Sequence, residues 1–361
     1  MHVNVTKPMA LHLGGAFALA LWAMPAAAWV EGCGPQSQTD TSQPTAAVAR
    51  CDAGSPPPAP LPAVETFTVG ITSMGVENSL VIAVGLDKGE FAAENLDVQM
   101  QVMPTPDATQ LVAQGQLDAG FSAPDASFHN AAAQDYTIRW VAGNFQARED
   151  SRAGLWAKAG TTHEDLRGEI IGSVVGPGST VTHFIDKALR DSGMTLADVV
   201  LQRFETATLI TALDNGGAKA VWLTDPAWSQ LADDPDYVQL ARQPAGQVFG
   251  GLLVGPNVLE GDKRAAGEAF VRAYLRTINT YFADDYKNDP EMNAYFAGVL
   301  GVPVENFTAV PAALWDWEIR SGTTDVLQEA MHVGGALRYE GLLPEERLVD
   351  RSLVASVLGA P

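Results

Sequence analysis

Residues 107–126 read DATQLVAQGQLDAGFSAPDA, and residues 206–227 repeat the same plan as TATLITALDNGGAKAVWLTDPA. In each copy a short apolar helix is predicted to end at a glycine, Gly115 or Gly216, because glycine readily adopts the left-handed backbone that follows a helix. A short apolar strand follows, and then a proline, where a new helix can begin. The predicted helices and strands of the two copies are residues 108–114, 117–121, 208–214 and 218–223.

The repeated pattern indicates two similar lobes, each with a strand that ends at a cluster of polar side chains facing a cleft. From residue 65 onward, runs typical of strands alternate with runs typical of helices, which favours largely parallel sheets covered by helices on both faces. A chain of 361 residues that is 47% hydrophobic is long enough for two domains. We predict one lobe from residues 65–153 and 255–361 and the other from residues 154–254.

The N-terminal region predicts export. Residues 1–28 have the features of a signal peptide, because a short apolar run is followed by alanines suited to cleavage. Residues 29–64 are rich in Gln, Ser, Thr, Pro and Ala and are predicted to be a flexible linker. Two fates of Cys33 remain open: lipidation as the first mature residue, or a disulfide with Cys51 in an oxidising compartment.

The charge of the chain argues against one class of partner. It has 43 acidic and 22 basic residues, for a formal net charge of -21. Nucleic-acid binding relies on Lys and Arg side chains that displace counterions from phosphates, and the sequence has no basic stripe of that kind. We therefore expect no nucleic-acid partner.

Motifs for catalysis are incomplete. Residues 120–124, GFSAP, come within one residue of a nucleophile elbow, but a proline replaces the last glycine. Residues 176–181, GPGSTV, lack the third glycine of a dinucleotide fingerprint and the lysine of a phosphate-binding loop. The six histidines do not fall at metal-ligand spacing. We therefore predict no catalytic residue, no cofactor and no metal site.

Four segments together resemble a known family. In chain order they read FAAENLDV at 91–98, GQLDAGFS at 115–122, DLRGEIIG at 165–172 and VWLTDP at 221–226. They are similar to segments of the substrate-binding proteins of ABC importers for taurine, alkanesulfonates, nitrate and thiamine-pyrimidine precursors. The resemblance extends over residues 66–357, and its C-terminal part is most similar to the taurine and sulfonate branch. It implies an α/β, two-lobed type II periplasmic binding protein fold, with mixed sheets flanked by helices, a hinge of two crossovers, and a ligand enclosed between the lobes.

The candidate ligand-binding residues follow predicted strand ends that face the cleft, where open α/β sheets place their ligands. In the first lobe they are Ser73, Met74, Ser122, Pro124, Asp125 and Gln146. In the second lobe they are Ser179, Thr180, Trp222 and Asp225.

Each group of these residues has a predicted role and an alternative. Ser179 and Thr180 begin a predicted helix and would hold an anion at its positive end; alternatively they only cap that helix. Trp222 would form a wall of the ligand site, with core packing as the alternative. Asp125 or Asp225 would bind an ammonium group, unless each only caps the helix that follows it. The resembling proteins usually have Glu or Ala at the position of Asp225.

These observations predict a monomeric, exported solute-binding protein, located in the periplasm or on the outer face of the cytoplasmic membrane. It would capture a small polar organic anion or zwitterion similar to taurine or an alkanesulfonate and deliver it to an ABC permease in the membrane. Three alternatives remain open: a thiamine-pyrimidine precursor as ligand, nitrate as ligand, or a ligand-sensing module that signals to a membrane receptor.

Overall fold

The computed structural model describes residues 56–74, 76–175, 178–245, 250–283, 285–319 and 321–358. The predicted signal peptide, Cys33 and Cys51 lie outside the described residues. Among the helices of the described part, none combines the length and apolar character needed to cross a bilayer.

The first sheet has the strand order β2-β1-β3-β11-β4. Strands β1 (Glu65–Ile71), β2 (Leu96–Val102) and β3 (Ala119–Ser122) run parallel. Strand β11 (Gly251–Val254) runs antiparallel between β3 and β4 (Arg139–Gly143). The sheet is therefore mixed, because β11, which comes from much later in the chain, runs antiparallel to both of its neighbours.

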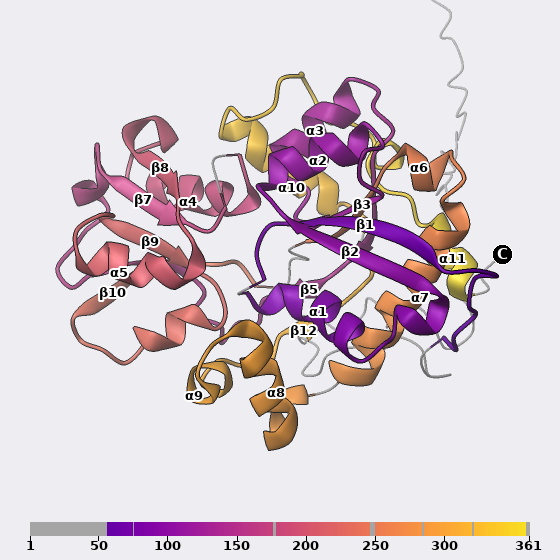
Figure 1. Cartoon of the computed structure of the whole chain (residues 1–361). Helices are drawn as coiled ribbons and strands as arrows, with labels where there is room; N and C mark the ends of the chain where they lie inside the picture. The colour runs from indigo at the N-terminus through magenta and orange to yellow at the C-terminus, as the bar shows by residue number, and fades with distance from the viewer. Residues whose placement is uncertain are drawn as a thin grey trace, which may run out of the picture.

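The second sheet repeats this arrangement. From one edge its order is β8 (Val200–Arg203), β7 (Ile170–Ser173), β9 (Ala220–Leu223), β6 (Gly154–Lys158) and β10 (Tyr237–Arg242). The first three strands are parallel, and β6 runs antiparallel to both of its neighbours. The repeat strands β3 and β9 therefore hold the same position in their sheets. The prediction of a two-lobed α/β fold with mixed sheets is confirmed (Figure 1).

The helices of the repeat end where the glycines predict. Helix α2 (Thr105–Ala113) precedes Gly115, whose φ is 70°, and helix α5 (Leu209–Asp214) precedes Gly216, whose φ is 73°. Both glycines are in the left-handed region that other residues rarely adopt.

The two copies differ after their prolines. In the first copy α3 (Ala126–Ala133) is a regular α-helix that begins after a capping aspartate. In the second copy the expected helix is only a short 3-10 helix, Ala227–Gln230, which lacks a side-chain cap. The two strand ends thus have different local structures, although their sheets match.

Helices flank both sheets, and the remaining elements come mainly from the C-terminal third. A stack of Phe67, Phe91 and Phe270 joins the first sheet to helix α7 (Arg264–Tyr281), with ring centroids 4.8 and 4.7 Å apart. The other helices and short strands are α1 (Leu80–Asp87), α4 (Thr180–Arg190), α6 (Pro256–Leu259), α8 (Pro290–Leu300), α9 (Val304–Thr308), α10 (Thr323–Val333), α11 (Ser352–Leu358), β5 (Phe145–Gln146) and β12 (Leu314–Trp315).

The chain passes between the lobes twice, once between β5 and β6 and once between β10 and β11. Because β11 pairs with β3 and β4, residues 251–254 belong to the first sheet and not to the second lobe, where the predicted boundary placed them. The second crossing therefore lies before residue 251.

The last residues of the predicted flexible linker are ordered against the first lobe. Leu61 is buried, and its backbone N–H donates to the carbonyl of Glu94 over 3.0 Å. Arg276 of α7 donates to the carbonyl of Pro56, and Arg272 donates to that of Ala59. Residues 56–64 therefore belong to the packed lobe, because two arginines of α7 donate hydrogen bonds to their carbonyl groups.

The C-terminal part also contacts the second lobe at two places. The guanidinium of Arg190 in α4 donates to the carbonyl of Val333 in α10 over 2.7 Å. The hydroxyl of Ser229 donates to the carbonyl of Asn306 in α9 over 3.2 Å. Figure 1 shows α9 and α10 on either side of the gap between the sheets, so the second lobe is contacted from two directions.

Candidate functional site

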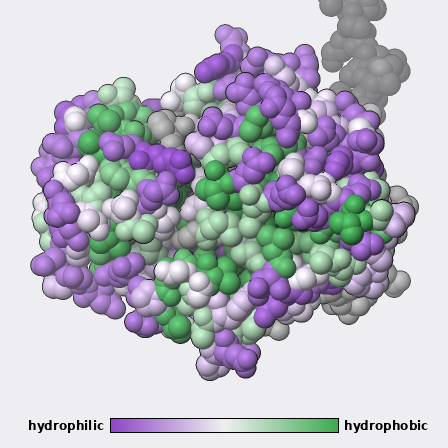
Figure 2. Space-filling view, in the orientation of Figure 1, coloured by the Kyte–Doolittle hydropathy of each residue, from purple (hydrophilic) through white to green (hydrophobic). Residues whose placement is uncertain are grey.

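A cavity lies between the two sheets and is lined by residues of both lobes. It has a volume of about 80 Å³, measured for the centres of water molecules. On that measure one water needs roughly 10–15 Å³, so the cavity has room for a molecule of several heavy atoms. In the space-filling view the lobes meet at a groove with hydrophobic residues on its walls (Figure 2).

The structure brings six of the ten predicted site residues to this cavity. Four of them are serines or threonines and two are aspartates. They are Ser73, Ser122, Asp125, Ser179, Thr180 and Asp225. They come from equivalent strand ends of the two lobes, after β1 and β3 on one side and before α4 and after β9 on the other. The hydroxyl groups of Ser73 and Thr206 approach to 3.4 Å across the cleft.

The other four predicted residues lie away from the cavity lining. Trp222 is 1% exposed and stacks on Phe184 in the core of the second lobe, with ring centroids 5.7 Å apart. Met74 packs against the core of the first lobe, and Pro124 is buried. The amide of Gln146 donates to Asp316 over 2.8 Å. The predicted wall at Trp222 is therefore replaced by its alternative, core packing.

The direction of Trp222 could not be derived from its strand. Strand β9 is buried along its whole length, so its sequence has no polar alternation that would mark one face. The strand end places Thr224 and Asp225 at the cavity instead.

Sequence reasoning missed several lining residues. Glu77 and Asn78 begin the 3-10 helix that follows β1, and Glu77 is 1% exposed. An acidic residue just after a strand-end loop was a usable signal for Glu77. Phe145 and Gln243, near the two crossings, also line the cavity, but no local pattern distinguishes them.

Asp125 caps its own helix. Its Oδ1 accepts hydrogen bonds from the backbone N–H of Ser127 at 2.9 Å, that of Phe128 at 3.1 Å and the Ser127 hydroxyl at 2.5 Å. Burial raises the pKa of Asp125 to about 6, against the lowering effect of these hydrogen bonds. This carboxyl group therefore serves the N-terminus of α3, which was its alternative role.

Asp225 does not cap a helix. Its Oδ1 accepts from the hydroxyl of Ser151 at 3.3 Å and from the indole N–H of Trp228. Burial, and then the neighbouring charge of Glu77, raise the pKa of Asp225 to about 6. The backbone carbonyl of Asp225 also accepts from the N–H of Glu77 over 3.3 Å, a hydrogen bond between the lobes.

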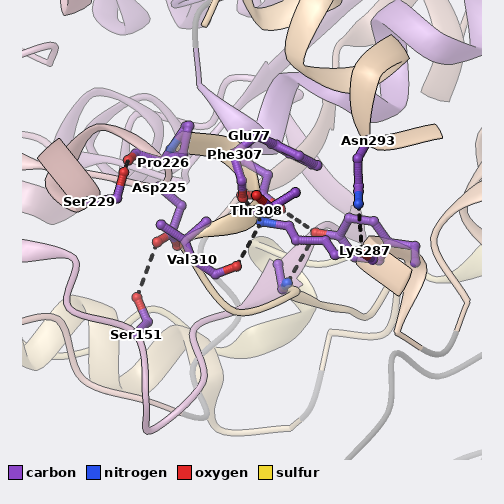
Figure 3. A network of polar contacts seen from close by, with 12 residues as sticks. Glu77, Ser151, Asp225, Pro226, Ser229, Lys287, Asn293, Phe307, Thr308 and Val310 are labelled. Carbon is purple, nitrogen blue, oxygen red and sulfur yellow. Dashed lines mark hydrogen bonds and ion pairs between the residues drawn. The ribbon is translucent and has the colours of Figure 1, made fainter. Parts of the chain in front are cut away.

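Glu77 has a cationic partner of its own. The ammonium of Lys287 lies 3.0 Å from its carboxyl group, and the hydroxyl of Tyr286 donates to the same group. The Lys287 ammonium also donates to the carbonyls of Phe307 at 3.2 Å and Val310 at 3.4 Å. Figure 3 shows this network between Asp225 and the C-terminal segments.

The N-terminus of α4 faces the cavity from the second lobe. The Ser179 hydroxyl accepts from the N–H of Thr182 over 3.3 Å, so it caps the helix. The side chain of Thr180 is 3% exposed and that of Ser122 is 8% exposed, and neither hydroxyl oxygen has a hydrogen-bond partner among the described residues. The first amides of a helix have no acceptor within it, so this end can accept a negatively charged or polar ligand group.

A backbone hydrogen bond joins the two helix starts across the cleft. The N–H of Ala126, the first residue of α3, donates to the carbonyl of Gly178 over 3.0 Å. Gly178 has a φ of 83°, which glycine adopts without strain. Together with the bond from Glu77 to Asp225, this contact holds the lobes closed around the cavity.

The chemistry of the lining is restricted. Among the described residues, three carboxyl groups line the cavity and no lysine, arginine, histidine or cysteine does. No group of three or more potential metal ligands occurs in the described part of the chain. The arrangement is suited to binding a polar molecule through hydroxyl, amide and carboxyl groups.

Comparisons with known proteins agree with this architecture. A family model described as NMT1/THI5 like matches residues 77–284. Curated protein sequences give no significant match. The fold is similar to that of the alkanesulfonate-binding protein SsuA of Xanthomonas axonopodis pv. citri, solved with MOPS bound, at a TM-score of 0.58 and 18% identity over 82% of this chain and 99% of that one.

Two other solved structures extend the comparison. The nitrate-binding protein NrtA of Synechocystis PCC 6803 matches with a TM-score of 0.61 and 11% identity, over 82% of this chain and 89% of that one. The ligand-binding component of an ABC-type import system of Staphylococcus aureus, solved with zinc bound, matches at 0.59 and 13%, over 81% and 99%. At these identities the likeness concerns the fold.

Proposed function

The chain belongs to the NMT1/THI5-like family, and we propose that it is the extracytoplasmic solute-binding protein of an ABC importer. The observation that carries this proposal is the cavity enclosed between two lobes of the same strand order, with lining residues from both. A ligand in such a cavity contacts both lobes only when they are closed. The structurally similar proteins named above bind alkanesulfonate or nitrate or belong to an ABC import system, which supports the same role.

The proposed ligand is a small polar organic anion or zwitterion, similar to taurine or an alkanesulfonate. The volume of about 80 Å³ supports a ligand of few heavy atoms. The N-terminus of α4, with the hydroxyls of Thr180 and Ser122, would bind its negatively charged group. A catalytic role is not proposed, because the described lining offers the Ser122 hydroxyl no adjacent histidine or lysine as a base.

Binding and release would follow from movement of the lobes about the two crossings. In the structure Asp225, Ser179 and Thr180 line the cavity together with Ser73 and Ser122. An open form would expose them to solvent. A ligand that contacts both sides stabilises the closed form, since it binds that form more tightly. The closed, ligand-bound protein would then dock on a membrane permease. In this proposal the protein is exported and is a monomer.

Thermal unfolding of the purified mature protein tests this proposal. We expect the melting temperature to rise with a member of a panel of taurine, alkanesulfonates, aliphatic carboxylates, nitrate and pyrimidines. A ligand present at a hundred times its Kd stabilises the native state by about 2.7 kcal/mol, which amounts to several degrees.

A variant of the site is Thr180→Val. It removes from the cavity one hydroxyl that has no partner among the described residues, at nearly constant volume. The variant should unfold at a similar temperature without ligand but show a smaller rise with it. An unchanged melting temperature across the panel, together with turnover of an ester or phosphate, would show that the protein is an enzyme instead.

A further inference from the structure

We propose that the ligand carries a cationic nitrogen and that this nitrogen binds the carboxylate of Asp225. The inference rests on the proposed function and specifies the class of ligand: an amine-bearing zwitterion or cation, in contrast to a simple anion such as nitrate or an amine-free sulfonate. Asp225 is a half-buried residue of the cavity lining, at the end of the second repeat.

The charge of the cavity is the first argument. Glu77, Asp125 and Asp225 all line it, and no lysine or arginine is among its described lining residues. An anion that entered with no countercharge would be desolvated beside these carboxyl groups, which is unfavourable. A ligand that brings a positive charge to the same place would reduce that cost.

Lys287, whose charge acts on Asp225, already has other acceptors. The Lys287 ammonium has Glu77 and the carbonyls of Phe307 and Val310 as acceptors, which uses all three of its N–H donors. Oδ1 of Asp125 likewise already accepts hydrogen bonds from backbone N–H groups at the start of α3. By contrast, the two groups that donate to Asp225, a serine hydroxyl and an indole N–H, are both uncharged. Asp225 is thus the lining carboxyl group best placed to accept a cation.

A second, independent observation also points to a ligand. The hydroxyl oxygens of Ser122 and Thr180 are buried, line the same cavity and have no partner among the described residues. Buried polar groups in folded proteins nearly always have hydrogen-bond partners. A polar ligand would supply these partners at the α4 side, while its nitrogen binds Asp225.

Matched pairs of molecules test the inference by titration calorimetry. The members of each pair differ only in an amino group: taurine and ethanesulfonate, β-alanine and propionate, and 4-aminobutyrate and butyrate. Nitrate, an aminopyrimidine and its hydroxy analogue complete the panel. We expect the amine-bearing member of a binding pair to bind at least about ten-fold more tightly, as for a charge-assisted hydrogen bond in a partly buried site.

Two variants connect that preference to Asp225. Asp225→Asn keeps the shape and one acceptor oxygen but removes the charge, and it should reduce the preference to about three-fold or less. Asp289→Asn removes a charge at the start of α8, outside the cavity lining, and retains a capping side chain, so it should leave the preference unchanged.

The outcomes separate the inference from the proposed function. If only amine-free anions bind, or if Asp225→Asn retains the full preference, the inference is wrong while solute binding stands. If neither member of any pair binds, nor any other molecule of the panel, both are wrong. A melting curve of Asp225→Asn without ligand verifies that the variant is folded.

Discussion

Asp125 and Asp225 both follow a strand of the repeat, Asp125 after β3 and Asp225 after β9, yet their carboxyl groups have different surroundings. Asp125 accepts from two backbone amides and a hydroxyl at the start of α3. Asp225 precedes a 3-10 helix that has no side-chain cap, and it faces the cavity beside Glu77. A single structural difference, a regular α-helix against a short 3-10 helix, therefore leaves the Asp225 carboxyl group without a capping role.

The raised pKa of Asp225 predicts how pH affects the stability of the ligand-free protein. Its pKa rises from 3.8 to about 6 in the folded state, so the folded state binds this proton more tightly than the unfolded state does. The stability contributed by the protonated form is present below about pH 4 and is lost as the pH rises to about 6.

Replacement by a neutral side chain should remove this loss. We expect Asp225→Asn to be more stable than the wild type by about 1–2 kcal/mol above about pH 7, with the difference shrinking below about pH 5. Urea unfolding at several pH values measures it. A variant that is less stable at high pH, or a difference independent of pH, would contradict this account.

At the scale of the element, the helix–glycine–strand unit depends on backbone conformation. Gly115 and Gly216 both have a positive φ, but their surroundings differ. A Cβ on Gly216 would meet no atom within 4 Å, whereas one on Gly115 would lie 2.7 Å from Oδ1 of Asn257. Asn257 is fixed there because its amide donates to the carbonyl of Gly115 at 2.9 Å and to Asp118 at 3.0 Å.

This contrast defines a matched pair of variants. Gly216→Ala should destabilise the protein by about 1–2 kcal/mol, the strain of a left-handed alanine. Gly115→Ala should cost about 1–2 kcal/mol more, because Asn257 must move and lose hydrogen bonds. Denaturant midpoints of the two variants test the order, and equal midpoints would mean that Asn257 adjusts without loss.

At the scale of the molecule, hydrogen bonds join the lobes, in addition to the apolar contact of Val310 with the core of the second lobe. They include the backbone bonds from Glu77 to Asp225 and from Ala126 to Gly178, and the bonds from Arg190 to Val333 and from Ser229 to Asn306. Such contacts can break and re-form without exposing a large apolar core, so opening is compatible with the fold.

A distance between the lobes should therefore respond to ligand. Val102 and Val200 lie on the edge strands β2 and β8 and are 60% and 50% exposed. With Cys33 and Cys51 changed to serine, spin labels on Val102→Cys and Val200→Cys report this distance. We expect a shorter and narrower distribution when a ligand from the panel is present, and an unchanged one would argue against closure.

The extent of sequence-based prediction varied with the type of signal. Strands, helices and the two-lobed fold were predictable, because glycine conformation and apolar periodicity act within a few residues. Residues 251–254 were placed in the wrong lobe, since strand pairing is set by partners far away in the chain. Residues 56–64 were predicted as flexible because their packing depends on Arg272 and Arg276, more than two hundred residues later.

The candidate site was likewise predictable from local sequence only in part. Its serines, threonines and aspartates were identifiable from the predicted strand ends, because the ends of equivalent strands meet at one cleft. Three other features depend on how separate segments pack. Trp222 is buried, Glu77 lines the cavity, and Lys287 forms an ion pair with Glu77. Local sequence thus determined two lobes and a polar cleft. The side chains that line the cavity were selected by long-range contacts, since only those contacts orient a buried strand and pair its charges.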